Sequence, residues 1–161
     1  MESFDRFRSV IDRLRSEGGC PWDREQTHMS LKAPCIEEAA EVIAGINIYD
    51  RTGNAENLKE ELGDLLLQVM MHARIAEEEG LFSIEDVING ITEKMIRRHP
   101  HVFGDESVSD SEEVLRNWEE IKNKEKLGKE DDITYLWDAF DESQELIEKA
   151  RERKKKRLKS E

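Results

Sequence analysis

The sequence has few of the residues that interrupt or cross-link a chain. Its 161 residues include only three prolines and two cysteines. Scarce proline leaves long stretches free to form helices. With 39% charged and 37% hydrophobic residues, the composition is typical of a helical globular protein. Cys20 and Cys35 are too few for a disulfide framework or a zinc knuckle, so we assign them no chemistry. These shortages favour an all-α fold.

The sequence also lacks a long hydrophobic run. No 18 consecutive residues are apolar, which argues against a transmembrane helix. The first 15 residues carry too many charges to resemble a secretory signal. We therefore expect a cytoplasmic protein without a membrane partner, and the length suits one domain with an appendage.

An excess of positive charge is missing as well. The net charge is -13, although residues 149–161 contain eight basic and two acidic residues. Binding to nucleic acid depends on Lys and Arg that displace counterions from phosphates, so we expect no nucleic acid partner. The acidic body also repels a bare triphosphate unless cations intervene.

Hydrophobic periodicity and turn residues predict five helices and a helix-prone tail. We expect helices over 3–17, from about 30–34 to 49, over 55–79, from 83 to before Pro100, and over 109–126. Segments 18–29 and 99–105 are predicted loops. Ser83 with Asp86, and Ser109 with Glu112, match the capping-box spacing, and Gly128 is expected to close the fifth helix.

Two acidic motifs lie on the second and third predicted helices. Residues 37–41 read Glu-Glu-Ala-Ala-Glu, and residues 61–64 read Glu-Leu-Gly-Asp. The i, i+3 spacing places Glu38 with Glu41, and Glu61 with Asp64, on one face of each helix. Adjacent antiparallel helices can therefore bring four carboxylates together, and Mg²⁺ prefers such oxygen ligands. The alternative is a solvated acidic face, since Glu is a common helix former.

The third predicted helix strengthens the first interpretation. From Leu62 to Ala73 nearly every direction around this helix is apolar, and the exceptions follow one narrow stripe. The stripe consists of Glu61, Asp64, Gln68 and His72. We interpret Gln68 and His72 as supporting residues rather than ligands. The alternative is that the stripe is the only solvent-facing strip of the helix. The apolar residues on several sides of this helix also predict self-association that buries them.

These motifs resemble the MazG family of nucleotide pyrophosphohydrolases. The resemblance covers about residues 4–126 and rests on linked motifs in order. These are Gly-Cys-Pro-Trp-Asp at 19–23, Gln26-Thr27, the two acidic motifs, Arg-Arg-His-Pro-His-Val-Phe at 97–103, and the segment from Trp118 to Lys122. It implies an all-α fold with a four-helix-bundle core, completed by dimerisation. On this basis residues 1–128 form the MazG-like domain and 129–161 a charged helical extension.

The resemblance implies Mg²⁺-dependent hydrolysis of nucleoside triphosphates to monophosphate and pyrophosphate, with Mn²⁺ as a substitute metal. The catalytic metal ligands would be Glu38, Glu41, Glu61 and Asp64, with Glu37 a less certain ligand. We hypothesise that water attacks the α-phosphorus while one carboxylate accepts its proton. The resemblance further suggests housecleaning of the nucleotide pool.

The same resemblance makes Lys94 and Arg98 phosphate contacts, Trp118 a base-stacking residue and Lys122 a nucleotide contact. Without it, the cations would be ordinary surface residues and Trp118 a core residue. Asn57 departs from the family pattern, because relatives can carry a basic phosphate contact there. The basic cluster at 153–157 is interpreted as a frayed helix end rather than a contact for an acidic partner.

Two other functions stay open at this point. One is a pyrophosphohydrolase dedicated to a single nucleotide, as in the related helical dUTPases and phosphoribosyl-ATP pyrophosphatases. The other is a helical interaction or regulatory module without catalysis, whose carboxylates form a solvated face and which acts through the basic tail. This module would show no dependence on Mg²⁺.

Overall fold

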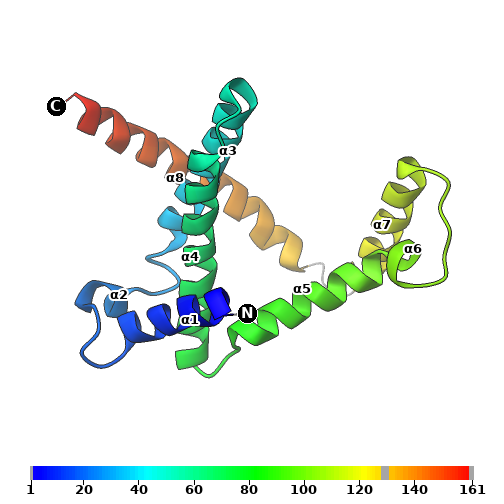
Figure 1. The fold of residues 1–161 in the computed structure, drawn as a ribbon, viewed down its shortest axis with the longest axis horizontal. Helices are drawn as coiled ribbons and strands as arrows, with labels where there is room; N and C mark the ends of the chain where they lie inside the picture. Colours follow the sequence, from blue (N-terminus) through cyan, green and yellow to red (C-terminus); the bar gives the residue numbers. More distant parts are fainter. Residues whose placement is uncertain (1, 128–130, 160–161) are drawn as a thin grey trace. The chain divides into compact units, whose positions relative to one another are not determined.

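The computed structural model describes residues 2–127 and 131–159, and within them all regular secondary structure is helical. The helices are α1 (Glu2–Arg15), α2 (Pro21–Glu25), α3 (Lys32–Thr52), α4 (Glu56–Glu78), α5 (Ile84–Arg98), α6 (Pro100–Phe103), α7 (Ser111–Lys126) and α8 (Asp131–Leu158) (Figure 1). The all-α class is confirmed. Among the described residues, no helix is both long enough and apolar enough to cross a membrane.

Two short helices lie where loops were predicted. α2 falls within 18–29 and α6 within 99–105, so those predictions were wrong in part. Both helices begin with a proline, Pro21 and Pro100. A proline at the first helical position lacks only a donor that would have no intrahelical partner, and its φ angle already suits a helix. Each proline therefore starts a helical turn.

The start of α7 differs by one residue from the predicted cap. The Oδ1 atom of Asp110, rather than the Ser109 hydroxyl, accepts the 2.9 Å hydrogen bond from the Glu113 backbone N–H. The Glu113 carboxylate in turn accepts from the backbone N–H of Ser109 at 2.8 Å. The capping interaction is thus present, but shifted from the predicted Ser109 and Glu112. Gly128 and the predicted domain boundary after it lie outside the described residues.

The chain divides into two compact units, which we describe separately. One comprises residues 1–84 and 140–161, and the other comprises residues 85–139. The main cluster of buried apolar residues in the first unit comes from α1, the turn before α3, α4 and the start of α5. Its members are Ile11, Leu31, Met70, Met71, Ala73, Ile75 and Ile84. This core anchors the C-terminal half of α4.

Helices α3 and α4 form an antiparallel pair joined by a short turn (Figure 1). Gly53 closes α3 in the left-handed region, with φ 71°, which a glycine adopts without steric cost. Further along, a Cβ atom built on Gly45 would lie 2.8 Å from the Cα atom of Leu58. The two backbones therefore approach closely, which brings the two acidic motifs onto neighbouring helices.

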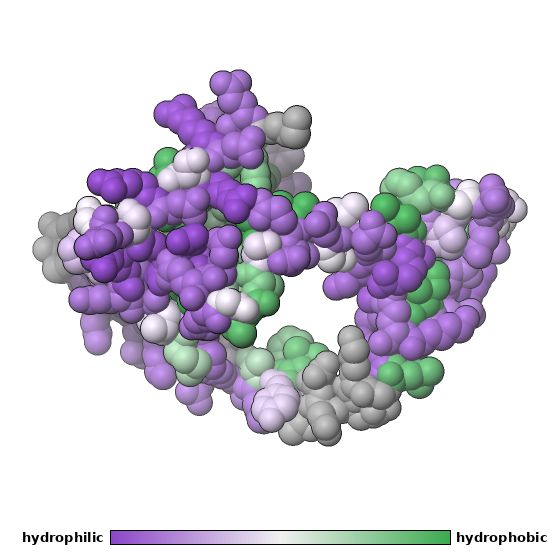
Figure 2. Space-filling view, turned by 90° about the horizontal axis from the view of Figure 1, so that it is seen from below, coloured by the Kyte–Doolittle hydropathy of each residue, from purple (hydrophilic) through white to green (hydrophobic). Residues whose placement is uncertain are grey.

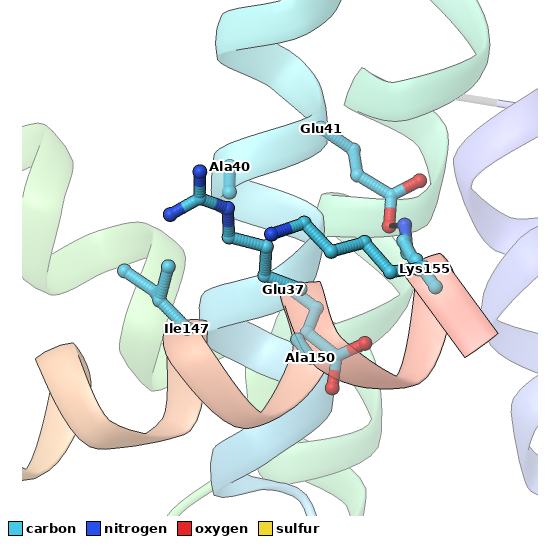
Figure 3. A pocket seen from close by; sticks show the side chains of 8 residues that line it. Glu37, Ala40, Glu41, Ile147, Ala150 and Lys155 are labelled. Atoms are coloured by element: carbon cyan, nitrogen blue, oxygen red, sulfur yellow. Dashed lines mark hydrogen bonds and ion pairs between the residues drawn. The ribbon is translucent and has the colours of Figure 1, made fainter.

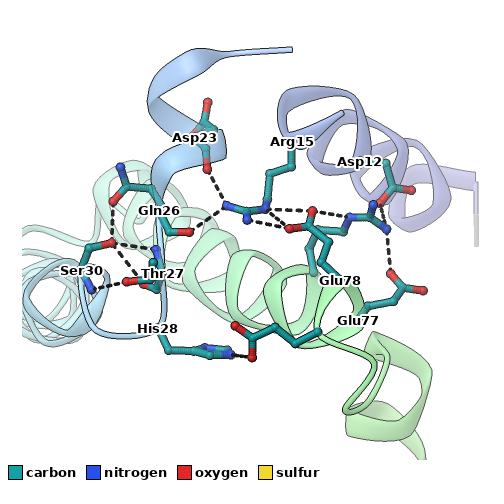
Figure 4. A network of polar contacts seen from close by, with 11 residues as sticks. Asp12, Arg15, Asp23, Gln26, Thr27, His28, Ser30, Glu77 and Glu78 are labelled. Carbon is teal, nitrogen blue, oxygen red and sulfur yellow. Dashed lines mark hydrogen bonds and ion pairs between the residues drawn. The ribbon is translucent and has the colours of Figure 1, made fainter. Parts of the chain in front are cut away.

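Arg15 ties the segment after α1 to the end of α4 (Figure 4). Its Nη2 atom lies 2.7 Å from the Glu78 carboxylate, and its Nη1 atom donates to the carbonyl oxygens of Asp23 and Gln26 at 2.5 and 3.2 Å. These bonds lower the pKa of Glu78 below its ordinary value, because a carboxylate beside a guanidinium holds its charge more readily. The network positions residues 20–31 beside α4.

Some of the apolar side chains of α4 are exposed to solvent. Leu62, Leu66 and Val69 are each more than two-fifths exposed. On the face drawn in Figure 2, hydrophobic patches interrupt a mainly hydrophilic surface. The exposed leucines agree with the reasoning that led us to expect self-association, which stays a prediction.

Candidate active site

Three of the four predicted metal ligands lie together. Glu38 of α3 and Glu61 and Asp64 of α4 each offer a carboxylate oxygen, and these atoms all lie within 4.8 Å of one another. The i, i+3 spacing on α4 puts two carboxylates on the face that meets α3. The close approach of the helices supplies the third. We call Glu38, Glu61 and Asp64 the carboxylate cluster.

The three residues of the carboxylate cluster differ in how far they are buried. Glu61 is only 9% exposed, Glu38 is half-buried and Asp64 is exposed. The alternative that the polar stripe of α4 is its solvent-facing strip is wrong, because Glu61 and Gln68 are buried while Leu62 and Leu66 are exposed. A buried carboxylate needs a partner, since desolvation penalises its charge. The arrangement therefore leaves an open side at Asp64 and a buried side at Glu61.

Asn57 supplies one partner for Glu61. Its Nδ2 atom donates a 2.9 Å hydrogen bond to Glu61 Oε1 from one turn earlier on α4. Asn57 is the residue that departs from the family pattern. In this chain its amide orients a carboxylate of the cluster, a role that the sequence analysis missed. The i, i+4 spacing to Glu61 was the available signal.

Electrostatic repulsion within the site acts on Glu38. Its pKa is raised, first by burial and then by the negative charges of Glu41, Asp64 and Glu61, while Lys154 acts in the opposite direction. Carboxylates that raise one another's pKa are stabilised by a cation between them. Because carboxylate oxygens are hard ligands and the outer side is open, the donor set fits a hard divalent cation with room for a further ligand.

The other two glutamates of the first motif face α8. The Oε1 atom of Glu37 lies 2.5 Å from a guanidinium nitrogen of Arg153, and Glu41 forms an ion pair with Lys154. Helical geometry explains the division, since Glu38 lies about 100° around α3 from Glu37. The basic cluster was interpreted as a frayed helix end. Instead, residues 153–157 belong to α8, and two of them pair with the acidic motif.

A cavity of about 360 Å³ lies where α8 crosses α3 (Figure 3). Its walls combine Ala40 of α3 with Ile147 and Ala150 of α8, and charged side chains of both helices complete its lining. Ala150 is 7% exposed, so α8 makes apolar contact as well as ion pairs here. The cavity therefore adjoins the first acidic motif.

The two residues predicted to support the site are both withdrawn from solvent. Gln68 is 7% exposed, and its Oε1 atom has no hydrogen-bond partner among the described residues. The Nδ1 atoms of His72 and His28 are 2.8 Å apart, and their rings are nearly parallel. Burial, and secondarily His28, lower the pKa of His72, so its neutral form is favoured.

The four predicted substrate contacts belong to the second unit, residues 85–139. Arg98 is 14% exposed in its side chain and lies 2.6 Å from the Glu125 carboxylate, which also binds Arg97. The guanidinium carbon of Arg98 lies 5.4 Å from the centre of the Trp118 ring. The structure thus brings Arg98 and Trp118 together, and Glu125 is a residue that the sequence analysis missed.

The remaining two predicted contacts have different surroundings. Lys122, one turn after Trp118, pairs with Glu119 at 3.2 Å on the same helix. Lys94, one turn before Arg98, is exposed. Both ammonium groups therefore lie at the surface of this unit.

Comparison with known proteins adds to this geometry. Residues 26–103 match the MazG nucleotide pyrophosphohydrolase domain, and this range contains the carboxylate cluster, Lys94 and Arg98. The chain is 55% identical over 123 residues to the uncharacterised protein YabN of Bacillus subtilis, covering 76% of the chain and 24% of that relative.

Two further relatives have functional names. The nucleoside triphosphate pyrophosphohydrolase/pyrophosphatase MazG of Thermotoga maritima is 51% identical over 123 residues, covering 76% of the chain and 45% of the relative. A nucleoside triphosphate pyrophosphohydrolase of Escherichia coli is 45% identical over 130 residues, covering 80% of the chain and 48% of the relative. The chain thus spans between a quarter and half of the length of these relatives. By this shared domain, it belongs to the MazG family of nucleotide pyrophosphohydrolases.

Proposed function

We propose that this protein hydrolyses nucleoside triphosphates, ribo- or deoxyribo-, to the monophosphate and pyrophosphate, and that it requires Mg²⁺. The observation that carries the proposal is the carboxylate cluster, with three carboxylate oxygens within 4.8 Å on two closely packed helices. Membership of the MazG family and the names of two relatives support the same reaction. We further propose that the protein acts in the cytoplasm and removes aberrant nucleotides.

In this proposal Glu38, Glu61 and Asp64 would hold the divalent ion, and Glu41 would join them once it leaves Lys154. Such a metal would offset the repulsion between carboxylates and triphosphate and would polarise the α-phosphoryl group. Asn57 keeps Glu61 oriented toward the metal. One carboxylate of the cluster accepts the proton of the attacking water, and the α–β phosphoanhydride bond breaks as pyrophosphate leaves.

The predicted substrate contacts of the second unit stay part of the proposal. Exposed Lys94 and half-buried Lys122 are suited to phosphate oxygens, because ammonium groups donate charge-assisted hydrogen bonds. Trp118 offers an aromatic face for the base, with Arg98 already held against its ring. Arg98 is fixed by Glu125, so we assign it the role of orienting Trp118 in addition to contacting phosphate.

The test is a panel of ribo- and deoxyribonucleoside triphosphates with and without Mg²⁺, with monophosphate and pyrophosphate resolved from diphosphate and phosphate. Glu61→Gln removes one charge of the carboxylate cluster and is expected to reduce kcat by at least about a hundredfold. Glu60→Gln removes the same charge from the neighbouring exposed residue and should leave turnover unchanged.

The panel also separates the alternative functions. Turnover of one nucleotide alone would indicate a dedicated pyrophosphohydrolase. No turnover of any nucleotide, together with no binding of Mg²⁺ or Mn²⁺, would contradict the proposal and favour an interaction module. Full activity of Glu61→Gln would contradict the assignment of the site.

A further inference from the structure

The basic turn of α8, comprising Arg153 and Lys154, lies against a motif that the proposed reaction uses. Lys154 pairs with Glu41, one of the predicted metal ligands, and Arg153 pairs with the adjacent Glu37. Both basic residues lie outside residues 26–103, which match the family. The function proposed above gives them no role.

A second ion pair, earlier on α8, also links this helix to α3. Lys32 at the start of α3 pairs with Glu142 of α8 at 2.9 Å, eleven residues before Arg153. Between these ion pairs Ala150 is buried, and Ile147 lines the cavity beside Ala40 (Figure 3). α8 is therefore held against α3 by ion pairs on either side of a shared, partly apolar cavity.

The ion pair with Glu41 brings the charge of Lys154 close to the carboxylate cluster. Glu41 lies three residues after Glu38 on α3, which puts the two carboxylates on one face of the helix. Both basic side chains are reached by solvent, since that of Lys154 is 50% exposed and that of Arg153 is 53% exposed. Ion pairs in contact with solvent contribute little to stability, so a change of partner costs little.

A metal-bound nucleotide would change the partners available at this position. A metal that draws Glu41 into its ligand set removes the carboxylate that Lys154 neutralises. The triphosphate brings several negative oxygens to the same metal, and an ammonium or guanidinium group donates charge-assisted hydrogen bonds to such oxygens. The cations of α8 would then be available to the phosphates.

We propose that Lys154, assisted by Arg153, is a substrate-contact residue that leaves Glu41 and Glu37 and binds the phosphates of the metal-bound nucleotide. This inference rests on the proposed function. It assigns to α8 a positive wall of the nucleotide site, opposite the acidic wall of α3. The ligand class is a nucleoside triphosphate complexed with a divalent metal.

The test measures binding without turnover. Isothermal titration calorimetry at saturating Mg²⁺ would give the affinity of wild type and Lys154→Met for an α,β-imido nucleoside triphosphate, a non-hydrolysable analogue. Methionine keeps the apolar stem and removes the charge. We expect about tenfold weaker binding, equivalent to about 1.4 kcal/mol, with recovery in Lys154→Arg and a smaller loss in Arg153→Met.

The matched control is Lys149→Met. Lys149 lies on the same helix, and its ion pair is with Glu145 of α8 itself, at 3.8 Å. Lys149→Met removes one positive charge, as Lys154→Met does, but from an ion pair within α8. The affinity for the analogue should therefore not change. A second titration with Mn²⁺ alone measures the metal separately. Lys154→Met should bind Mn²⁺ as tightly as wild type or more tightly, because Glu41 is no longer shared.

Each other outcome would overturn the inference. Unchanged analogue affinity in Lys154→Met would show that Lys154 is only a counter-ion of Glu41, even if Mn²⁺ binding improves. An equal loss in Lys149→Met would show a general effect of charge. If wild type binds neither metal nor analogue, the proposed function itself fails, which distinguishes that failure from the failure of Lys154 as a contact.

Discussion

Asn57 donates a 2.9 Å hydrogen bond to Glu61, the most buried carboxylate of the cluster. Both residues lie on α4, one turn apart, so the bond forms within a single helix. A hydrogen bond of this kind holds a metal-binding carboxylate in one orientation, and its loss weakens the affinity for metal.

Asn57→Ala should therefore weaken metal binding while preserving the fold. We expect Mn²⁺ affinity, measured by calorimetry, to fall by about tenfold or more. Thermal unfolding should change little, because alanine has a better helix propensity than asparagine. Glu60→Ala is the control for the loss of an exposed polar group on the same helix. Unchanged Mn²⁺ affinity in Asn57→Ala would show that Asn57 does not orient a metal ligand.

Gly45→Ala should separate α3 from α4. The added Cβ atom would lie 2.8 Å from backbone of Leu58, so the helices must move apart. We expect the free energy of unfolding to decrease by about 1–3 kcal/mol in urea titrations, as for other overpacked sites. Gly90→Ala in α5, where nothing lies within 4 Å, should instead stabilise by up to about 1 kcal/mol. A neutral Gly45→Ala would contradict the close approach.

The ion pair between Arg15 and Glu78 predicts a pH dependence of stability. The folded pKa of Glu78 is lowered, so its contribution is present above its unfolded pKa of about 4.3 and is lost as pH falls through the folded pKa. Glu78→Gln should cost about 1–2 kcal/mol at pH 7. The difference from wild type should shrink below about pH 4. Chemical denaturation at several pH values measures the free energy of unfolding of wild type and of Glu78→Gln. A difference between them that stays constant with pH would exclude this contribution.

The exposed leucines of α4 predict self-association. Leu62 and Leu66 lie on one face at i, i+4 spacing, and burying them in a homodimer would remove apolar area from water. We expect a dimer at micromolar concentration by light scattering after size exclusion, and a monomer for Leu66→Glu. Leu81→Glu, at an exposed leucine beyond the end of α4, is the control. A monomeric wild type would refute the prediction.

Local rules accounted for most of the helices. Hydrophobic periodicity predicted α1, α3, α4, α5 and α7, because apolar residues recur along each of these segments at helical spacing. It missed α2 and α6, which are too short to show a period and which start at prolines. The shifted cap of α7 has a similar origin, since Ser109 and Asp110 are both good capping residues and lie side by side.

The site was only partly predictable. The i, i+3 spacing was enough to propose Glu61 with Asp64, since it depends on one helix alone. Whether Glu38 or Glu41 completes the cluster depends on how α3 is rotated against α4, and Glu38 is the one that lies there. The buried polar stripe of α4 was likewise ambiguous, because a helix with apolar residues on several sides does not reveal which side faces its own chain.

The sequence by itself determined the helical class, the approximate ends of α1, α3, α4, α5 and α7, and the family, because these depend on residues close together along the chain. Only the tertiary structure decided the partners of Glu37 and Glu41, which lie more than a hundred residues away in α8. A run of basic residues does not by itself identify the acidic residues with which it will pair. That choice is made by packing, which brings distant side chains within the few ångströms over which an ion pair forms.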